Sequence, residues 1–90
     1  MRTPVQILHL EDDPHDAELA RAALEEGLEC IVRHVKTRQA FEAAIQDCKE
    51  DLILCDNSLP GYSGVAALQA ARAQCPEIPV ILLSGTLGEE

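Results

Sequence analysis

The chain has 90 residues, of which 47% are hydrophobic and 26% are charged, and its formal net charge is −9. This length predicts one small domain with a single hydrophobic core. The acidic balance opposes binding to nucleic acid or to anionic lipid, because no basic patch is present to displace phosphate counterions. With one Phe, one Tyr and no Trp, an aromatic platform for stacking bases is missing as well.

No apolar stretch approaches the roughly 18 residues that a membrane span needs, and the first residues reach acidic side chains too soon for a signal peptide. We therefore expect a cytoplasmic protein with no membrane partner. Four cysteines, Cys30, Cys48, Cys55 and Cys75, have no C-x-x-C spacing and each lies in an apolar periodic segment. This pattern favours reduced thiols buried in the core over a zinc site or a disulfide framework.

The predicted elements alternate between strands and helices along the chain. Short, nearly continuous apolar runs, typical of strands covered on both faces, occupy 5–10, 51–55 and 78–83. Segment 29–35 alternates polar and apolar residues, which predicts a strand at the edge of the sheet. Segments of helical period occupy 14–26, 38–48 and 64–74. The predicted helix caps are Asp13 with Pro14 following it, Thr37 and Ser63, with Gly27 just past the first helix.

Strands that alternate with helices predict an α/β fold with a parallel sheet and right-handed crossovers. We expect a flavodoxin-like, doubly wound sheet with strand order 2-1-3-4, in which the fifth βα unit is missing. The final residues Thr86 to Glu89 have the T-x-x-E form of a capping box, which opens a helix. Residues 1–90 are thus predicted to be one incomplete domain that ends at the start of its fourth helix.

Acidic residues follow two of the predicted strands directly. Glu11, Asp12 and Asp13 come after 5–10, and Asp56 comes after 51–55. In the predicted strand order these two strands are neighbours, and ligands bind beyond their carboxyl ends. Gathered carboxylates need a cation to stay ionised, and oxygen ligands with open positions suit Mg²⁺. For Asp13 alone, a helix N-cap is the simpler interpretation.

A carboxylate beside such a metal can act as a nucleophile and form an acyl phosphate. Asp56 is the candidate for this role, since the protein then has mainly to position groups and neutralise charge around a loose phosphoryl transition state. Ser84-Gly85-Thr86 at the end of the last predicted strand adds a hydroxyl on the same side of the sheet. Alone this is a weak signal, because Ser and Gly commonly end strands as turn residues.

With these residues in place, the chain resembles the response-regulator receiver family over nearly its whole length. ILHLEDDP is similar to the first strand and acidic pair of the family, and DLILCDNSLPGYSG to its third strand, phosphoacceptor and following turn. PVILLSG is similar to the fourth strand with its Ser/Thr switch residue. The three motifs occur in the right order, at strand ends and with the right helices between them.

The resemblance implies a role for each matching position. Asp56 matches the phosphoacceptor, Asp12 the direct Mg²⁺ ligand and Glu11 a ligand acting through water, while the backbone carbonyl of Ser58 matches the third protein ligand. Ser84 matches the switch hydroxyl that turns toward the phosphate. The remaining matches are Asn57 and Thr86, which influence how fast the phosphate is lost, and Pro60 and Gly61, which shape the turn.

The resemblance also implies partners, and the sequence departs from the family at one point. A histidine kinase is the implied phosphodonor, and an output or sensor domain in a longer parent chain the implied recipient of the signal. Receivers carry a Lys at the end of a fifth strand that pairs with the phosphoryl group, and neither Lys36 nor Lys49 is placed to substitute for it. Because the fifth βα unit is missing, the uncharged strand 78–83 is an edge of the sheet. Such an edge predicts a homodimer or a strand swap through it.

Three other functions are alternatives to a phosphoacceptor module. A pseudo-receiver, which keeps the fold as a binding or dimerisation module without carrying phosphate, is the main alternative because the Lys is missing. A phosphatase of the haloacid-dehalogenase kind expects a second Asp two residues after the nucleophile, where this chain has Ser58. A phosphohistidine carrier needs an exposed mid-helix histidine, which none of His9, His15 and His34 provides. We therefore expect a signalling module rather than an enzyme.

Overall fold

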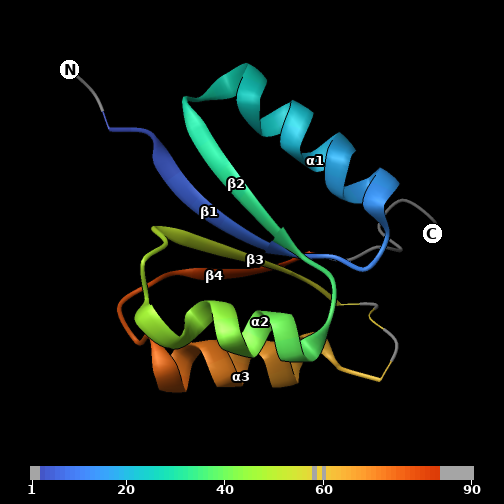
Figure 1. Ribbon diagram of the computed structural model, residues 1–90, viewed down its shortest axis with the longest axis vertical. Helices are drawn as coiled ribbons and strands as arrows, with labels where there is room; N and C mark the ends of the chain where they lie inside the picture. The colour runs from blue at the N-terminus through green and yellow to red at the C-terminus, as the bar shows by residue number, and fades with distance from the viewer. Residues whose placement is uncertain (1–2, 58, 60, 84–90) are drawn as a thin grey trace.

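The computed structural model describes residues 3–57, 59 and 61–83. Within them the chain alternates strands and helices (Figure 1), and a short 3-10 helix, η1, follows the second α-helix. The elements in chain order are β1 (Val5–Leu10), α1 (Pro14–Gly27), β2 (Cys30–Val35), α2 (Arg38–Ala44), η1 (Ile45–Asp47), β3 (Leu52–Asp56), α3 (Gly64–Gln74) and β4 (Val80–Leu83).

The strands form one parallel sheet of order β2-β1-β3-β4. Its registers pair Leu10 with Val35 on β2 and with Cys55 on β3, and pair Asp56 with Leu83 on β4. Figure 1 shows α1 on one face of the sheet and α2 and α3 together on the other. The predicted flavodoxin-like α/β fold, its strand order and the edge position of β2 are confirmed.

The main core lies between the sheet and the pair α2 and α3. Its fully buried side chains come from β1, β3, α2 and α3 and include Leu8, Leu10, Phe41, Ile53 and Ala67. Burial of these apolar groups contributes roughly 1.5–3 kcal/mol for each large side chain. The layer of helices thereby holds β1 and β3 side by side, so that their carboxyl ends are fixed relative to one another.

Local signals place the helices where the sequence predicts them. The side chain of Asp13 accepts hydrogen bonds from the His15 and Asp16 backbone amides, while Thr37 and Ser63 cap α2 and α3 in the same way. Helix α2 ends earlier than expected, at Ala44, because the chain tightens into η1. Gly27 is the last residue of α1 rather than the residue after it.

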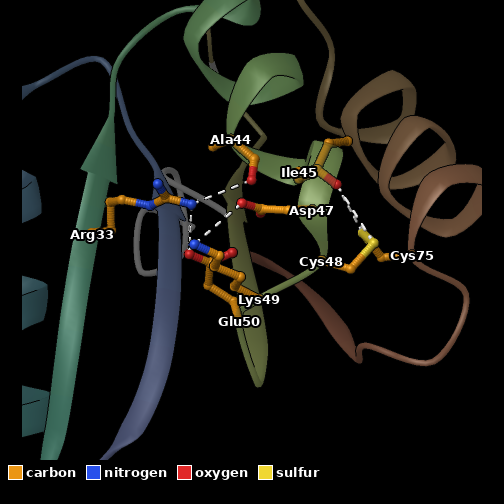
Figure 2. Close-up of polar contacts among 8 residues, drawn as sticks. All are labelled: Arg33, Ala44, Ile45, Asp47, Cys48, Lys49, Glu50 and Cys75. Atoms are coloured by element: carbon orange, nitrogen blue, oxygen red, sulfur yellow. Dashed lines mark hydrogen bonds and ion pairs between the residues drawn. A yellow bond between two sulfur atoms is a disulfide. The ribbon is translucent and has the colours of Figure 1, made fainter.

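The prediction of four reduced cysteines is wrong for two of them. Cys48, after η1, and Cys75, after α3, form a disulfide whose Cα atoms are 5.6 Å apart (Figure 2). Helical periodicity assigns each cysteine to the apolar face of its own helix, but the carboxyl ends of α2–η1 and α3 meet, which periodicity within one element cannot show. Cys55, fully buried in β3, and Cys30, half-buried in β2, are free thiols as expected.

An ion pair also holds the segment between η1 and β3, on the side opposite the disulfide. Arg33 of β2 donates to the Glu50 carboxylate at 2.7 Å and to the Ala44 carbonyl oxygen at 3.2 Å (Figure 2). The side chain of Glu50 is only 6% exposed, whereas that of Arg33 is 49% exposed. Arg33 therefore compensates a buried charge, and it ties edge strand β2 to the start of β3.

Candidate functional site

The site lies at the carboxyl ends of two adjacent strands. Glu11 and Asp12 follow β1 directly, and Asp56 is the last residue of β3. Because Leu10 and Cys55 are partners in the parallel register, the residues just beyond them emerge together. One carboxylate oxygen from each of Glu11, Asp12 and Asp56 lies within 4.8 Å of the other two. Residues more than 40 positions apart in sequence thus converge on one site.

The three carboxylates differ in their access to solvent. Glu11 and Asp56 are buried, at 7% and 6% exposure, whereas Asp12 is exposed. The open side of the cluster is therefore the side of Asp12, and a ligand would meet this carboxylate first. Asp56 is seated deeper, at the end of a strand that is hydrogen bonded on both sides.

Backbone contacts hold Glu11 in place. Its amide donates to the Val35 carbonyl oxygen at 3.0 Å, and its carboxylate accepts from the Asp13 amide at 3.1 Å. His34 Nε2 lies 2.6 Å from the Glu11 carbonyl oxygen. Since a carbonyl oxygen only accepts, this nitrogen carries the hydrogen and donates it. Edge strand β2 thereby positions the acidic end of β1.

The carboxyl group of Glu11 has a strongly perturbed pKa. Burial is the main cause that raises it, to about 7 from 4.5, and the hydrogen bond from the Asp13 amide opposes this shift. The negative charge of Asp56 and a hydrogen bond with its side chain raise the pKa further. Like charges in a desolvated site disfavour ionisation, and a cation there would reverse that effect.

The donor set fits a hard divalent cation. Carboxylate oxygens are the ligands that Mg²⁺ prefers, and it commonly uses one or two of them while keeping positions open for water and phosphate. Here burial, and to a lesser extent the charge of Asp56, raises the pKa of Glu11, so its ionised form is disfavoured when no cation offsets the charge. An oxygen-only set with one exposed member can thus hold Mg²⁺ and leave part of its coordination sphere accessible.

Other residues predicted for the site follow Asp56 in sequence or lie outside the described residues. Asn57 follows Asp56 and donates its amide to the Leu83 carbonyl oxygen at 2.9 Å, which joins the loop to β4. Gly61 has φ +73°, a left-handed conformation that favours glycine. Ser58, Pro60, Ser84 and Thr86 are the predicted site residues that lie outside the described part of the chain.

Gly64 and His34 are site neighbours that the sequence reasoning did not single out. A Cβ atom on Gly64, the first residue of α3, would lie 2.5 Å from Asn57 Oδ1 and 2.9 Å from Asn57 Cα. The glycine thus lets α3 approach the loop that carries the site. The contact of His34 could have been anticipated from the parallel register, which places β2 residues beside the end of β1.

A parallel sheet of order 2-1-3-4 with clustered acids at its carboxyl edge defines a doubly wound α/β domain with a candidate cation site, and comparisons with known proteins identify the family. The family model of the response regulator receiver domain matches residues 7–90. The chain belongs to the response-regulator receiver family. Receiver domains are signalling modules of two-component systems rather than enzymes.

Two curated relatives are transcriptional regulators. The chain is 37% identical over 87 residues to the phosphate regulon transcriptional regulatory protein PhoB of Pseudomonas aeruginosa, covering 93% of this chain and 37% of PhoB. It is 31% identical over 84 residues to the hydrogenase transcriptional regulatory protein HoxA of Cupriavidus necator, covering 93% of this chain and 17% of HoxA. The chain therefore spans well under half the length of either relative.

A solved receiver domain shares the fold of this chain. The receiver domain of the sensor histidine kinase PA1611 from Pseudomonas aeruginosa PAO1 superposes with a TM-score of 0.80 at 26% identity, over 96% of this chain and 72% of that one. In that structure a magnesium ion is coordinated in the active site cleft.

Among the residues described for the present chain, no helix is both long enough and apolar enough to cross a membrane.

Proposed function

We propose that this chain is the phosphoacceptor module of a two-component system and that Asp56 receives the phosphoryl group from a histidine kinase. The observation that carries the proposal is the convergence of Glu11, Asp12 and Asp56 within 4.8 Å at the carboxyl edge of the sheet. The family assignment supports it, as does the magnesium ion in the PA1611 receiver structure.

In the proposed reaction an oxygen of the Asp56 carboxylate attacks the phosphorus of a phosphohistidine. The new O–P bond forms as the P–N bond breaks, and the electron pair of that bond stays on the imidazole nitrogen of the kinase. Bound Mg²⁺ would supply positive charge to offset the carboxylates and the phosphoryl oxygens. Asp12, Asp56 and the Ser58 carbonyl are the proposed direct ligands, and Glu11 is proposed to act through water.

The remaining predicted residues have supporting roles in this proposal. Ser84 would contact the phosphoryl group as the switch hydroxyl, while Asn57 and Thr86 would tune the loss of phosphate. Pro60 and Gly61 would shape the turn after the phosphoacceptor. The proposed location is the cytoplasm, where a histidine kinase could reach the site.

The proposed partners are a histidine kinase, an output or sensor domain in a longer parent chain, and a second copy of the chain. PhoB and HoxA support the second of these, since both are regulators much longer than this chain. The edge of β4 supports the third, because in the described residues it pairs only with β3, and Ile81 is 47% exposed. Light scattering tests it: a dimer fraction that grows with concentration is expected, and a monomer at every concentration would contradict it.

The phosphoacceptor proposal is tested by incubating the chain with acetyl phosphate, with and without Mg²⁺, and measuring its intact mass. A metal-dependent gain of one phosphoryl group, absent in Asp56→Asn, is the expected result. Lys49, one of the chain's two lysines, pairs with Asp47 at the opposite end of β3 from Asp56. If a folded protein that still binds Mg²⁺ gains no phosphoryl group, the result would favour the alternative, a pseudo-receiver or dimerisation module that does not carry phosphate.

A further inference from the structure

The disulfide joins two elements that the sheet does not connect directly. Cys48 follows η1 and Cys75 follows α3, 27 residues later, so the bond closes the ends of these helices against each other (Figure 2). Both sulfurs lie near the Ile45 carbonyl oxygen, at 3.1 Å for Cys75 and 3.5 Å for Cys48. Gln74 also donates to the Gln46 carbonyl oxygen at 3.2 Å. The Gln74–Gln46 hydrogen bond therefore joins the two ends independently of the disulfide.

The backbone at Cys48 is held in an unfavourable conformation. Its φ of 50° and ψ of 46° are left-handed, and it is the only residue other than glycine with positive φ in the described part of the chain. Helices commonly end on a residue in this conformation, but glycine or asparagine normally occupies the position. The left-handed backbone conformation therefore does not favour a cysteine at this position. What it provides is a sulfur directed at Cys75.

The two sulfur positions differ in their access to solvent. Cys48 is exposed, whereas Cys75 is 2% exposed. A cavity of about 200 Å³ opens beside the bond and is lined by Cys48, Cys75, Pro76, Glu77 and Ile78. An attacking thiol can therefore reach the bond from this side, and the sulfur it meets with least obstruction is that of Cys48.

We propose that Cys48 and Cys75 form a reversible dithiol–disulfide site in which Cys48 is the sulfur that exchanges with external thiols. A thiolate of a dithiol reductant attacks Cys48 Sγ, a mixed disulfide forms, and the bond to Cys75 breaks with its electron pair on Cys75 Sγ, which takes a proton from solvent. The second thiol of the reductant then attacks the reductant sulfur that is bonded to Cys48 in the mixed disulfide. This releases Cys48 as a thiol and leaves the reductant oxidised.

The reverse reaction uses a disulfide oxidant such as oxidised glutathione. The Cys48 thiolate attacks one sulfur of oxidised glutathione and displaces the other glutathione as a thiolate, which takes a proton from solvent. The Cys75 thiolate then attacks Cys48 Sγ in the mixed disulfide, closes the protein disulfide and releases the second glutathione in the same way. Disulfides in reducing compartments are usually transient and redox-sensing, which is the behaviour expected of an accessible bond. The site lies near the start of β3, at the opposite end of that strand from Asp56, so this inference does not depend on the phosphoacceptor proposal.

The experiment equilibrates the full chain in buffers of defined ratios of reduced to oxidised glutathione, quenches with acid, and measures intact and peptide masses. The background is Cys30→Ser, which removes the half-buried free thiol. Burial raises the pKa of Cys55 to about 12, so this thiol stays protonated and unreactive and serves as an internal reference. We expect a species lighter by two hydrogens under oxidising conditions, with a Cys48–Cys75 linked peptide that disappears under reducing ones.

Two single variants test which sulfur exchanges. With oxidised glutathione, Cys75→Ala should gain one glutathionyl group on Cys48, whereas folded Cys48→Ala should gain at least tenfold less on Cys75. Equal labelling of both variants would overturn the assignment of Cys48. A folded protein, judged by circular dichroism, that forms no linked peptide at any glutathione ratio would overturn the site itself.

Thermal unfolding provides a readout that does not depend on labelling. Closing a loop of 27 residues should raise the melting temperature of the oxidised form on the order of 10 °C above the reduced form, and Cys48→Ala should abolish the difference. In the reduced protein Cys48→Gly should melt no lower than Cys48→Ala, because glycine accepts the left-handed backbone. The opposite order would contradict the view that Cys48 is placed for its sulfur.

Discussion

Replacing Glu11 with Gln should make the metal-free protein more stable at alkaline pH and leave it unchanged in acid. Burial and the proximity of Asp56 raise the pKa of Glu11 to about 7 in the folded protein, from 4.5. Below pH 4.5 the carboxyl group is protonated in both folded and unfolded chains. Between pH 4.5 and 7 the folded chain holds a proton that the unfolded chain releases, so stability falls as the pH rises through this window.

The size of the effect follows from the difference between the two pKa values. With a pKa of about 7 in the folded chain and 4.5 in the unfolded chain, and 1.36 kcal/mol for each tenfold change in the ionisation equilibrium, the cost is about 3 kcal/mol once both states are ionised, near pH 8. Glutamine has nearly the same shape, can still accept from the Asp13 amide, and carries no charge. We therefore expect Glu11→Gln to gain about 2–3 kcal/mol over the unsubstituted chain at pH 8 and almost nothing at pH 4.5.

The assay is urea denaturation followed by circular dichroism between pH 4.5 and 8, with a chelator present. Glu26→Gln is the matched control, since Glu26 is exposed on α1 and should show no pH-dependent difference. The titrations of groups that do not interact with Glu11 cancel in the comparison because every chain contains them. If Glu11→Gln and the unsubstituted chain keep the same difference in free energy of unfolding across this range, the raised pKa of Glu11 is refuted.

Two further substitutions test contacts around the site and the sheet. Arg33→Met should cost about 2–4 kcal/mol, since it leaves the Glu50 carboxylate buried without its cation; chemical denaturation should show that Arg33→Met/Glu50→Leu recovers most of this loss, and failure to recover would contradict it. Gly64→Ala should cost about 1–3 kcal/mol and slow phosphorylation, because the new Cβ would displace the Asn57 backbone. Gly27→Ala, with open space around its Cβ, is the control, and equal effects of the two would refute this reasoning.

Much of the fold followed from local signals in the sequence. The nearly continuous apolar runs at β1, β3 and β4 predict strands covered on both faces, and their alternation with helices predicts parallel pairing. The caps at Asp13, Thr37 and Ser63 form the predicted hydrogen bonds. Strand order then predicts which strand ends meet, and the acids at the ends of β1 and β3 do converge.

What could not be predicted depends on contacts between distant elements. The disulfide requires the ends of η1 and α3 to meet, and helical periodicity assigns Cys48 and Cys75 to separate apolar faces. The ion pair of Arg33 with Glu50 joins an edge strand to a turn 17 residues later. The raised pKa of Glu11 depends on its burial beside Asp56, which the spacing of acidic residues does not show.

The most direct test of the central claim is phosphorylation by acetyl phosphate in the presence of Mg²⁺, with the modified residue located by peptide mass. The account predicts one phosphoryl group on Asp56, lost on addition of chelator before the donor, absent in Asp56→Asn, and strongly reduced in Asp12→Asn. Labelling that survives Asp56→Asn, or that proceeds equally well without a divalent cation, would contradict it.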